Sequence, residues 1–128
     1  MNEYSLAQSA AQSFTKALGT RDWDLLRSIL AESIVWELPG KSAVSGKIAG
    51  VDAAIAHIGK IASYGVTFNL KHILTGPHGF ALSLNNTGRR ERAVLDEYLA
   101  TVCEMQEGKV HRIQTYIWDI PMMEQFFR

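Results

Sequence analysis

The apolar residues of this chain change their spacing near residue 65, and this change limits the possible folds more than any other feature. Before it, apolar residues recur every three to four positions, as on one face of a helix; after it they alternate, as in a strand. Helices that precede long strands indicate an α+β fold, with helices on one side of a curved sheet. The pattern predicts helices over about 5–18, 23–30 and 51–64 and strands over about 34–38, 66–75, 79–87, 91–106 and 109–118.

Residues that favour caps and turns mark the ends of these segments. Ser5 and Gln8 have the spacing of a capping box for the first helix, and Asp22 can cap the second. Pro121 suits the first turn of a short last helix. The small, polar stretch 41–50 is expected to be a loop. Turns between strands are predicted at Gly76-Pro77-His78-Gly79, Asn86-Thr87-Gly88 and Glu107-Gly108.

Composition excludes several classes of partner. The 128 residues carry 13 basic and 13 acidic side chains, which suits one soluble domain over residues 1–128 with no net charge. Binding to phosphate backbones or anionic lipid needs clustered, uncompensated Lys and Arg, so we expect neither nucleic acid nor a membrane as partner. No apolar stretch reaches the roughly 18 residues that span a bilayer. The first ten residues lack the features of a signal peptide, so a cytoplasmic location is expected.

The sequence motifs of cofactor chemistry are missing. There is no G-x-G-x-x-G, no P-loop, no H-E-x-x-H and no serine nucleophile elbow. The four histidines and Cys103, the only cysteine, show no metal-ligand spacing. We therefore expect no cofactor and no metal, which leaves proton transfer by carboxylates and histidines as the available chemistry.

Several short motifs follow one another along nearly the whole chain: Phe14-x-x-Ala17-Leu18-x-x-Arg21-Asp22-Trp23-Asp24, Val35-Trp36-Glu37-Leu38-Pro39-Gly40, Gly46 and Gly50, Glu107-Gly108-Lys109-Val110, and Tyr116 to Asp119. Together they resemble the NTF2-like superfamily, specifically its SnoaL-like and ketosteroid-isomerase-like proteins. The resemblance implies a cone of strongly bent, mainly antiparallel sheet closed by three N-terminal helices. It also implies a homodimer with a pocket for a small hydrophobic ligand inside the cone.

The resemblance to ketosteroid isomerase implies a catalytic carboxylate at Glu37, at the end of the first strand. The places of the two oxyanion-hole donors hold Phe14 and Thr101. A phenyl ring cannot donate a hydrogen bond, and a hydroxyl donates a weaker one than a carboxylic acid in an apolar site. Steroid isomerisation is therefore not expected as the native activity. The SnoaL-type cyclases imply instead an acid/base residue at Asp119, toward the end of the last strand.

Each candidate catalytic residue also has a structural interpretation. Glu37 would be desolvated in an apolar strand, which suits proton transfer, or it could bond to the amides of the following loop. Asp119 could be catalytic or could cap the last helix. His72 falls in phase with Val66 and Phe68 on an apolar face. It could act as a base there, or it could be a core residue whose hydrogen bonds are satisfied.

Alternation along the last strands identifies the side chains that should line the cone. On the last strand His111, Ile113, Thr115 and Ile117 share a face with Asp119, and the matching set on the strand before is Glu97, Leu99, Thr101 and Cys103. The predicted ligand-binding residues are Phe14, Trp36, Glu97, Thr101, Ile113, Thr115 and Ile117. The opposite face should carry the dimer contact, with Val94, Tyr98, Val102, Tyr116 and Trp118.

Two functions stay open on the sequence. The first is a cofactor-independent enzyme that isomerises, cyclises or hydrates a small hydrophobic molecule. The second is a non-catalytic binding or dimerisation module of the same fold. An enzyme needs a titratable group with a perturbed pKa inside the cavity, whereas a binder needs only shape and apolar area. Epoxide hydrolysis ranks last, because Arg112 has the wrong parity to join Asp119.

Overall fold

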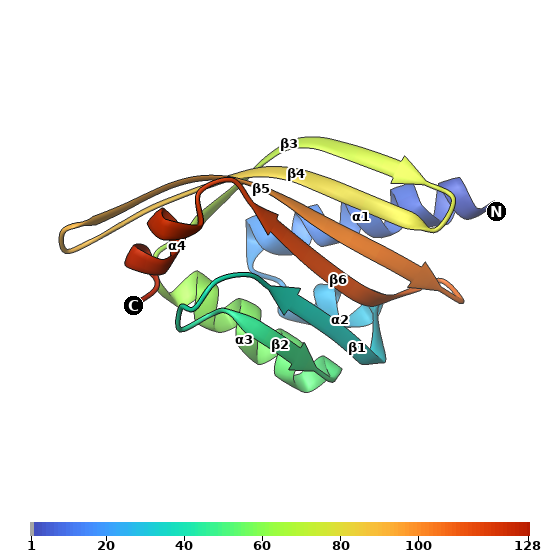
Figure 1. The fold of residues 1–128 in the computed structure, drawn as a ribbon. Helices are drawn as coiled ribbons and strands as arrows, with labels where there is room; N and C mark the ends of the chain where they lie inside the picture. The colour runs from blue at the N-terminus through green and yellow to red at the C-terminus, as the bar shows by residue number, and fades with distance from the viewer. Residues whose placement is uncertain (1) are drawn as a thin grey trace.

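The computed structural model describes residues 2–128, which form helices on one side of a curved sheet (Figure 1). The α+β fold and the predicted order of elements are confirmed, with one added strand. The elements are α1 (Glu3–Thr20), α2 (Trp23–Ile29), β1 (Leu30–Leu38), β2 (Gly46–Ala49), α3 (Val51–Ser63), β3 (Thr67–Gly76), β4 (Gly79–Arg90), β5 (Ala93–Gln106), β6 (Lys109–Ile117) and α4 (Ile120–Phe126).

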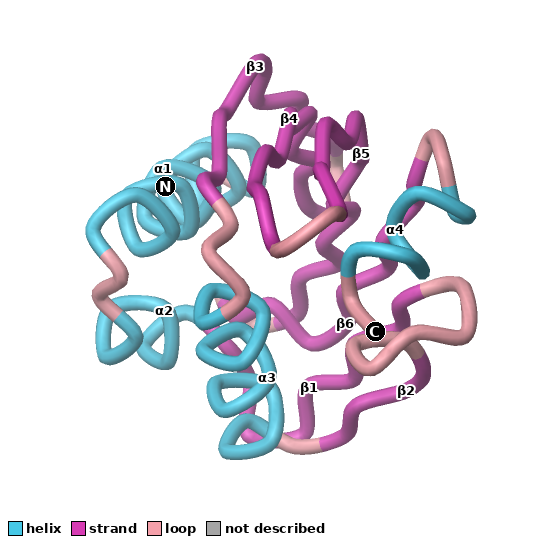
Figure 2. Tube along the Cα trace, turned by 90° about the vertical axis from the view of Figure 1, so that its left-hand side faces the viewer, coloured by secondary structure: helices cyan, strands magenta, loops and turns pink. Residues whose placement is uncertain are grey.

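The strands form one sheet in the order β2-β1-β6-β5-β4-β3. All neighbouring pairs are antiparallel except β1 and β6, which run parallel. The first three helices lie on one face of this sheet (Figure 2), with α1 against β3 and β4 and α3 against β1 and β2. The short α4 contacts β5 and lies under the long β4–β5 hairpin (Figure 1). The concave face of the sheet is thereby enclosed.

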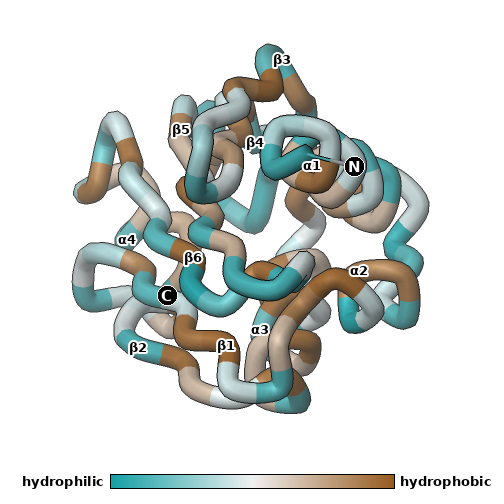
Figure 3. The backbone as a smooth tube through the Cα atoms, turned by 90° about the vertical axis from the view of Figure 1, so that its right-hand side faces the viewer, coloured by the Kyte–Doolittle hydropathy of each residue, from teal (hydrophilic) through white to brown (hydrophobic). Residues whose placement is uncertain are grey.

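The core lies between this concave face and the helices. In α1 the buried positions recur at helical spacing, and most are alanines that let the helix approach the sheet closely. Apolar segments of β1 and α3 lie next to each other (Figure 3). Strand β4 alternates buried and half-buried residues from Phe80 to Asn86, which is the pattern of a strand with one face in the core.

Two predicted element boundaries near the N-terminus are wrong. Helix α1 begins at Glu3, because the side chain of Asn2 and not of Ser5 is the cap: Asn2 Oδ1 accepts the Ser5 N–H at 2.9 Å. The stretch 41–50 is not all loop, since Gly46–Ala49 pairs antiparallel with β1 as strand β2.

The predicted turn at Asn86-Thr87-Gly88 is also wrong. Strand β4 continues to Arg90 and the hairpin turns at Glu91, whose φ of 47° is left-handed. Gly88 is a glycine for another reason: a Cβ there would lie 2.9 Å from the Phe126 ring and 3.0 Å from the Gly65 carbonyl oxygen. The glycine therefore marks a close approach of α4 to the strand and not a chain reversal.

Candidate functional site

A mainly apolar cavity lies between the concave face of the sheet and the helices. Its free volume is about 50 Å³, enough for roughly three to five waters. The wall draws on β1, β3, β4, β5, β6, α1, α3, the loop after β1, and α4 with the residue that follows it. It consists of Phe14, Leu18, Trp36, Leu38, Pro39, Val44, Ser45, Ile58, Ile61, Phe68, Leu84, Asn86, Glu97, Leu99, Thr101, Thr115, Ile117, Met123 and Phe127.

Strand register arranges the sheet side of this wall in three rows. Asn86 of β4 stands directly opposite Glu97 of β5 and forms a polar row. The next row is apolar, with Leu99 between its partners Leu84 and Ile117. The third row places Thr101 of β5 opposite Thr115 of β6. The cavity floor is therefore polar at both ends and apolar in the middle.

Glu97 is the ionisable side chain of the cavity wall. It is 3% exposed, and its Oε1 has no hydrogen-bond partner among residues 2–128. Desolvation by burial raises its pKa from 4.5 to about 7, because the charged form loses hydration that the apolar wall does not replace. At neutral pH this carboxyl can therefore either hold or release a proton.

Asn86, opposite Glu97, is a functional candidate that the sequence analysis missed. Its side chain is 6% exposed, and Oδ1 is buried without a partner in the described part of the chain. Two neighbouring polar groups with open hydrogen-bonding capacity are unusual in a protein interior, where such groups are nearly always paired. The pair therefore indicates a place where a ligand completes the hydrogen bonds.

At the other end of the floor, a tryptophan orients a hydroxyl. Trp36 Nε1–H donates to Thr115 Oγ1 at 3.0 Å, and both side chains are buried. The Trp36 ring packs edge-on against the ring of His57, with centroids 5.2 Å apart. His57 Nε2 lies 2.8 Å from the Val44 carbonyl oxygen, and burial lowers the pKa of this histidine. His57 thus holds the loop after β1 and supports Trp36 from behind.

The open side of the cavity is closed by α4 together with the loop after β1. Ala43 N–H donates to the Phe127 carbonyl oxygen at 2.9 Å, and Lys41 N–H donates to Glu124 Oε2 at 2.6 Å. Gly40 permits this path of the loop, because its φ of 87° is in the left-handed region that favours glycine. Loop and helix are therefore one closing element, which contributes Met123 and Phe127 to the wall.

The structure brings most of the predicted ligand-binding residues together. Six of the seven lie in the cavity wall: Phe14, Trp36, Glu97, Thr101, Thr115 and Ile117. The seventh, Ile113, is buried at 2% exposure beside Trp36 in the sheet but is not part of the wall. Burial of Leu95, Glu97, Thr101 and Cys103 confirms the strand parity that was inferred for β5.

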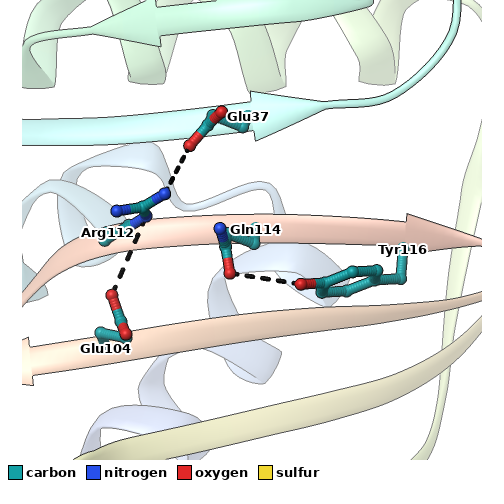
Figure 4. A network of polar contacts seen from close by, with 5 residues as sticks. All are labelled: Glu37, Glu104, Arg112, Gln114 and Tyr116. Atoms are coloured by element: carbon teal, nitrogen blue, oxygen red, sulfur yellow. Dashed lines mark hydrogen bonds and ion pairs between the residues drawn. The ribbon is translucent and has the colours of Figure 1, made fainter.

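The predicted placement of Glu37 inside the cone is wrong. Its side chain is 44% exposed on the outer face of the sheet, where Oε1 accepts a hydrogen bond from Arg112 Nη2 at 2.8 Å (Figure 4). Arg112 Nε also lies 3.9 Å from Glu104 Oε2. The physical reason is strand alternation: Trp36 points into the cavity, so its neighbour Glu37 points away from it.

The predicted cavity positions of His72 and Asp119 are also wrong. A register shift between Leu70 and His72 reverses the phase of β3, so His72 is exposed rather than on the apolar face. Asp119 Oδ1 accepts the Met122 N–H at 3.1 Å and caps α4, which was the alternative left open for it. Neither residue lies in the cavity wall.

Residues 2–128 contain neither a cluster of metal ligands nor a helix suited to cross a membrane. No group of three or more His, Cys, Asp and Glu side chains in this range is placed to hold a metal ion. None of the helices described is both long and apolar enough to cross a membrane.

No family model matches the sequence, and no curated protein matches it. Solved structures do match. Bal32a, from a soil-derived mobile gene cassette, has a TM-score of 0.93 and 24% identity over 99% of this chain and 100% of Bal32a. An NTF2-like protein from Burkholderia xenovorans LB400 has a TM-score of 0.83 and 22% identity over 98% of both chains. An LEH-like epoxide hydrolase from M. tuberculosis has a TM-score of 0.74 and 20% identity, over 98% of this chain and 91% of the other.

These likenesses define the class of fold. The bent sheet and the helices that close it form an NTF2-like fold, which is the fold that the resemblance of the sequence motifs implied. The neighbours differ in activity, so the function of this chain has to be argued from its own cavity.

Proposed function

We propose that this protein is a cofactor-independent enzyme that moves protons on a small hydrophobic, carbonyl-bearing molecule, with Glu97 as the acid/base group. The observation that carries the proposal is a carboxyl that is 3% exposed, unpartnered and part of an apolar cavity wall. Burial raises its pKa to about 7. A general acid or base works best when its pKa lies near the working pH, so this group suits isomerisation, cyclisation or hydration.

The other polar groups of the wall support this chemistry. Proton removal next to a carbonyl places negative charge on the carbonyl oxygen, and a hydrogen-bond donor fixed beside that oxygen stabilises the charge. The Asn86 amide stands directly opposite Glu97 and can donate to the oxygen of a small ketone whose adjacent proton Glu97 takes. The Thr115 hydroxyl, at the other end of the floor, can donate to the oxygen of a longer conjugated substrate, because its own oxygen already accepts the Trp36 Nε1–H. We therefore assign substrate binding to Thr115, as the sequence predicted, and to Asn86, while the predicted catalytic residues Asp119 and His72 take no part in this site.

A binding protein without catalysis is the second candidate, and one observation favours it. Glu97 is the sole ionisable side chain in the cavity wall as described, so a separate acid and base are not both present. Such a site can hold a polar ligand by shape and two hydrogen-bonding rows alone. Epoxide hydrolysis has less support, because it needs two carboxylates and an arginine around one water, and Arg112 faces outward.

Proton transfer can be tested without knowing the natural substrate. The protein is incubated in D₂O with cyclopentanone, cyclohexanone and 2-cyclohexenone, and exchange of the protons next to the carbonyl is followed by NMR. We expect exchange above the rate without protein, rising with pH around 7 as Glu97 ionises. Glu97→Gln keeps the shape of the side chain and should lower exchange about 100-fold or more.

Glu37→Gln is the matched control, since it makes the same change on the outer face of the sheet. It should retain wild-type exchange. Loss of exchange in Glu37→Gln with retention in Glu97→Gln would contradict the proposal. Absence of exchange with all three ketones, combined with tight binding of any of them, would leave the binding protein as the better conclusion.

We also propose that the protein forms a homodimer through the outer face of its sheet. Val94, Tyr98, Tyr116 and Trp118 are each at least 50% exposed there, and the rings of Tyr98 and Trp118 pack edge-on with centroids 5.8 Å apart. The same face carries charges of both signs in the Glu37–Arg112–Glu104 cluster (Figure 4). In a symmetric dimer the two copies present the same surface to each other, so a surface with both signs of charge can pair with itself. Sedimentation should give a dimer that Trp118→Ser weakens; a 14.2 kDa species for the wild type would refute it.

A further inference from the structure

The two polar rows of the cavity floor have opposite hydrogen-bonding needs. Glu97 Oε1 and Asn86 Oδ1 are buried acceptors that receive no hydrogen bond from residues 2–128. Thr115 Oγ1 has already accepted the Trp36 Nε1–H, so its own hydrogen remains to be donated. That hydrogen finds no acceptor in the part of the chain that the structure describes. One end of the floor therefore requires a donor, and the other end an acceptor.

Strand geometry gives the distance between these two ends. Glu97 and Thr101 lie four residues apart on β5, with Leu99 between them on the same face. At about 3.3 Å per residue the two backbone positions are roughly 13 Å apart. Hydrogen bonds of about 3 Å at each end leave roughly 7 Å for the ligand, about the length of one substituted six-membered ring.

The middle of the cavity suits such a ring. The apolar row of Leu84, Leu99 and Ile117 forms its floor, and the rings of Phe14 and Phe127 belong to the facing wall. Apolar side chains around the middle of a ligand supply affinity, and a few polar groups at its ends fix its orientation. The free volume of about 50 Å³ is less than a ring needs, so Met123 and Phe127 of the closing element have to move outward when a ring enters, and this favours a compact molecule.

We propose that the ligand of this cavity is a compact ring compound with a hydroxyl group at one end and a carbonyl-type oxygen at the other. The hydroxyl donates its hydrogen to Glu97 and lies beside the Asn86 amide, and the carbonyl oxygen accepts from the hydroxyls of Thr101 and Thr115. This inference rests on the proposed function, since it names the substrate class for the same site.

The arrangement also suits proton transfer. When the ligand O–H bond breaks, its proton passes to the Glu97 carboxylate, and the electron pair stays on the ligand. In a conjugated ring that negative charge spreads to the carbonyl oxygen, which is the end that the threonine hydroxyls hold. The row with Glu97 would thus take the proton, while the row with the threonines stabilises the negative charge that the proton leaves on the ligand.

Three compounds test this inference by isothermal titration calorimetry. 4-Hydroxyacetophenone carries both polar ends, acetophenone lacks the hydroxyl and 4-ethylphenol lacks the carbonyl. We expect 4-hydroxyacetophenone to bind about tenfold more tightly than either. It should also shift the Trp36 Nε1–H resonance in NMR spectra, because its oxygen bonds to the hydroxyl that accepts from this indole. 4-Ethylphenol should shift that resonance less.

Variants at each row separate its contribution. Thr115→Val should weaken 4-hydroxyacetophenone about 3- to 10-fold and leave 4-ethylphenol unchanged, while Asn86→Leu should weaken both phenols and spare acetophenone. Thr101→Val provides a second test of the hydroxyl row if Thr115→Val does not fold. Thr75→Val, on the exposed side of β3, is the control and should change none of the affinities.

The possible failures are distinguishable. Equal affinity for the three compounds, no binding at millimolar concentration, or a Thr115→Val effect shared by all three would overturn the ligand class. The ketone exchange test of Glu97 would stand in each of these cases. Selective binding of 4-hydroxyacetophenone without any exchange would overturn the enzymatic function and leave the ligand class intact.

Discussion

Replacing Glu97 by Gln should remove a pH-dependent loss of stability. The Glu97 carboxyl has a pKa of about 7 in the folded protein, raised by burial from 4.5. Between these two values the folded protein holds a proton that the unfolded chain has released. Stability therefore falls as pH rises, because the folded state then has to lose a proton to reach a charged form that its interior does not hydrate.

The size of the effect follows from the difference between the two pKa values. At about 1.4 kcal/mol per pH unit, the difference corresponds to about 3 kcal/mol of unfolding free energy. The stability is fully present below the unfolded pKa of 4.5 and lost once the pH exceeds about 7. Gln does not titrate, so the variant should gain about 3 kcal/mol relative to wild type across this range.

Urea unfolding followed by tryptophan fluorescence, at several pH values from about 4 to 8, measures this difference. The pH dependence is the informative quantity, since a fixed cost of burying the Gln amide is the same at every pH. Glu37→Gln, with its half-exposed side chain, should keep the wild-type dependence. A wild-type-minus-Glu97→Gln difference that stays constant from pH 4 to 8 would refute the reasoning about burial.

Two further substitutions test the packing around the cavity. Gly88→Ala should lower the unfolding free energy by about 1–3 kcal/mol, because its Cβ would lie 2.9 Å from the Phe126 ring. Gly76→Ala is the control: a Cβ there has no atom within 4 Å, so the loss of unfolding free energy should be less than half as large. Thr115→Val should lower the unfolding free energy by about 1–2 kcal/mol, because the buried Trp36 Nε1–H loses its acceptor. An unchanged urea midpoint for Gly88→Ala or for Thr115→Val would contradict the contact that the variant tests.

The elements of the fold could be predicted because periodicity is a local property. The switch from helical spacing to alternation depends on neighbours a few residues apart, and it located the helices and the long strands. Strand parity also placed Glu97, Thr101 and Thr115 on the inner face, since each strand carries its own alternating pattern. The inner face of β5 and β6 was therefore accessible without coordinates.

The candidate acid/base residue could not be identified in the same way. Glu37 was chosen because of its position along the chain, at the end of the first strand. The direction of its side chain depends instead on strand alternation: Trp36 points into the cavity, so Glu37 points outward. A single bulge on β3 was enough to turn His72 outward. Asn86 was hidden because Asn-Thr-Gly is a turn signal, whereas the glycine is explained by the close approach of Phe126 and the Gly65 carbonyl oxygen to Gly88. Such contacts join residues far apart in sequence, so no local pattern reveals them.

The composition of the cavity wall has a consequence for how the site comes into being. The wall combines Phe14 of the first helix with Met123 and Phe127 at the other end of the chain. A nascent chain therefore has to emerge from the ribosome through residue 127 before the cavity can close. Until then the cavity lacks the side chains of Met123 and Phe127, and the Glu97 carboxyl is less desolvated than in the folded protein. Closing of the site is therefore coupled to proton uptake, because burial shifts the equilibrium of Glu97 toward its neutral form.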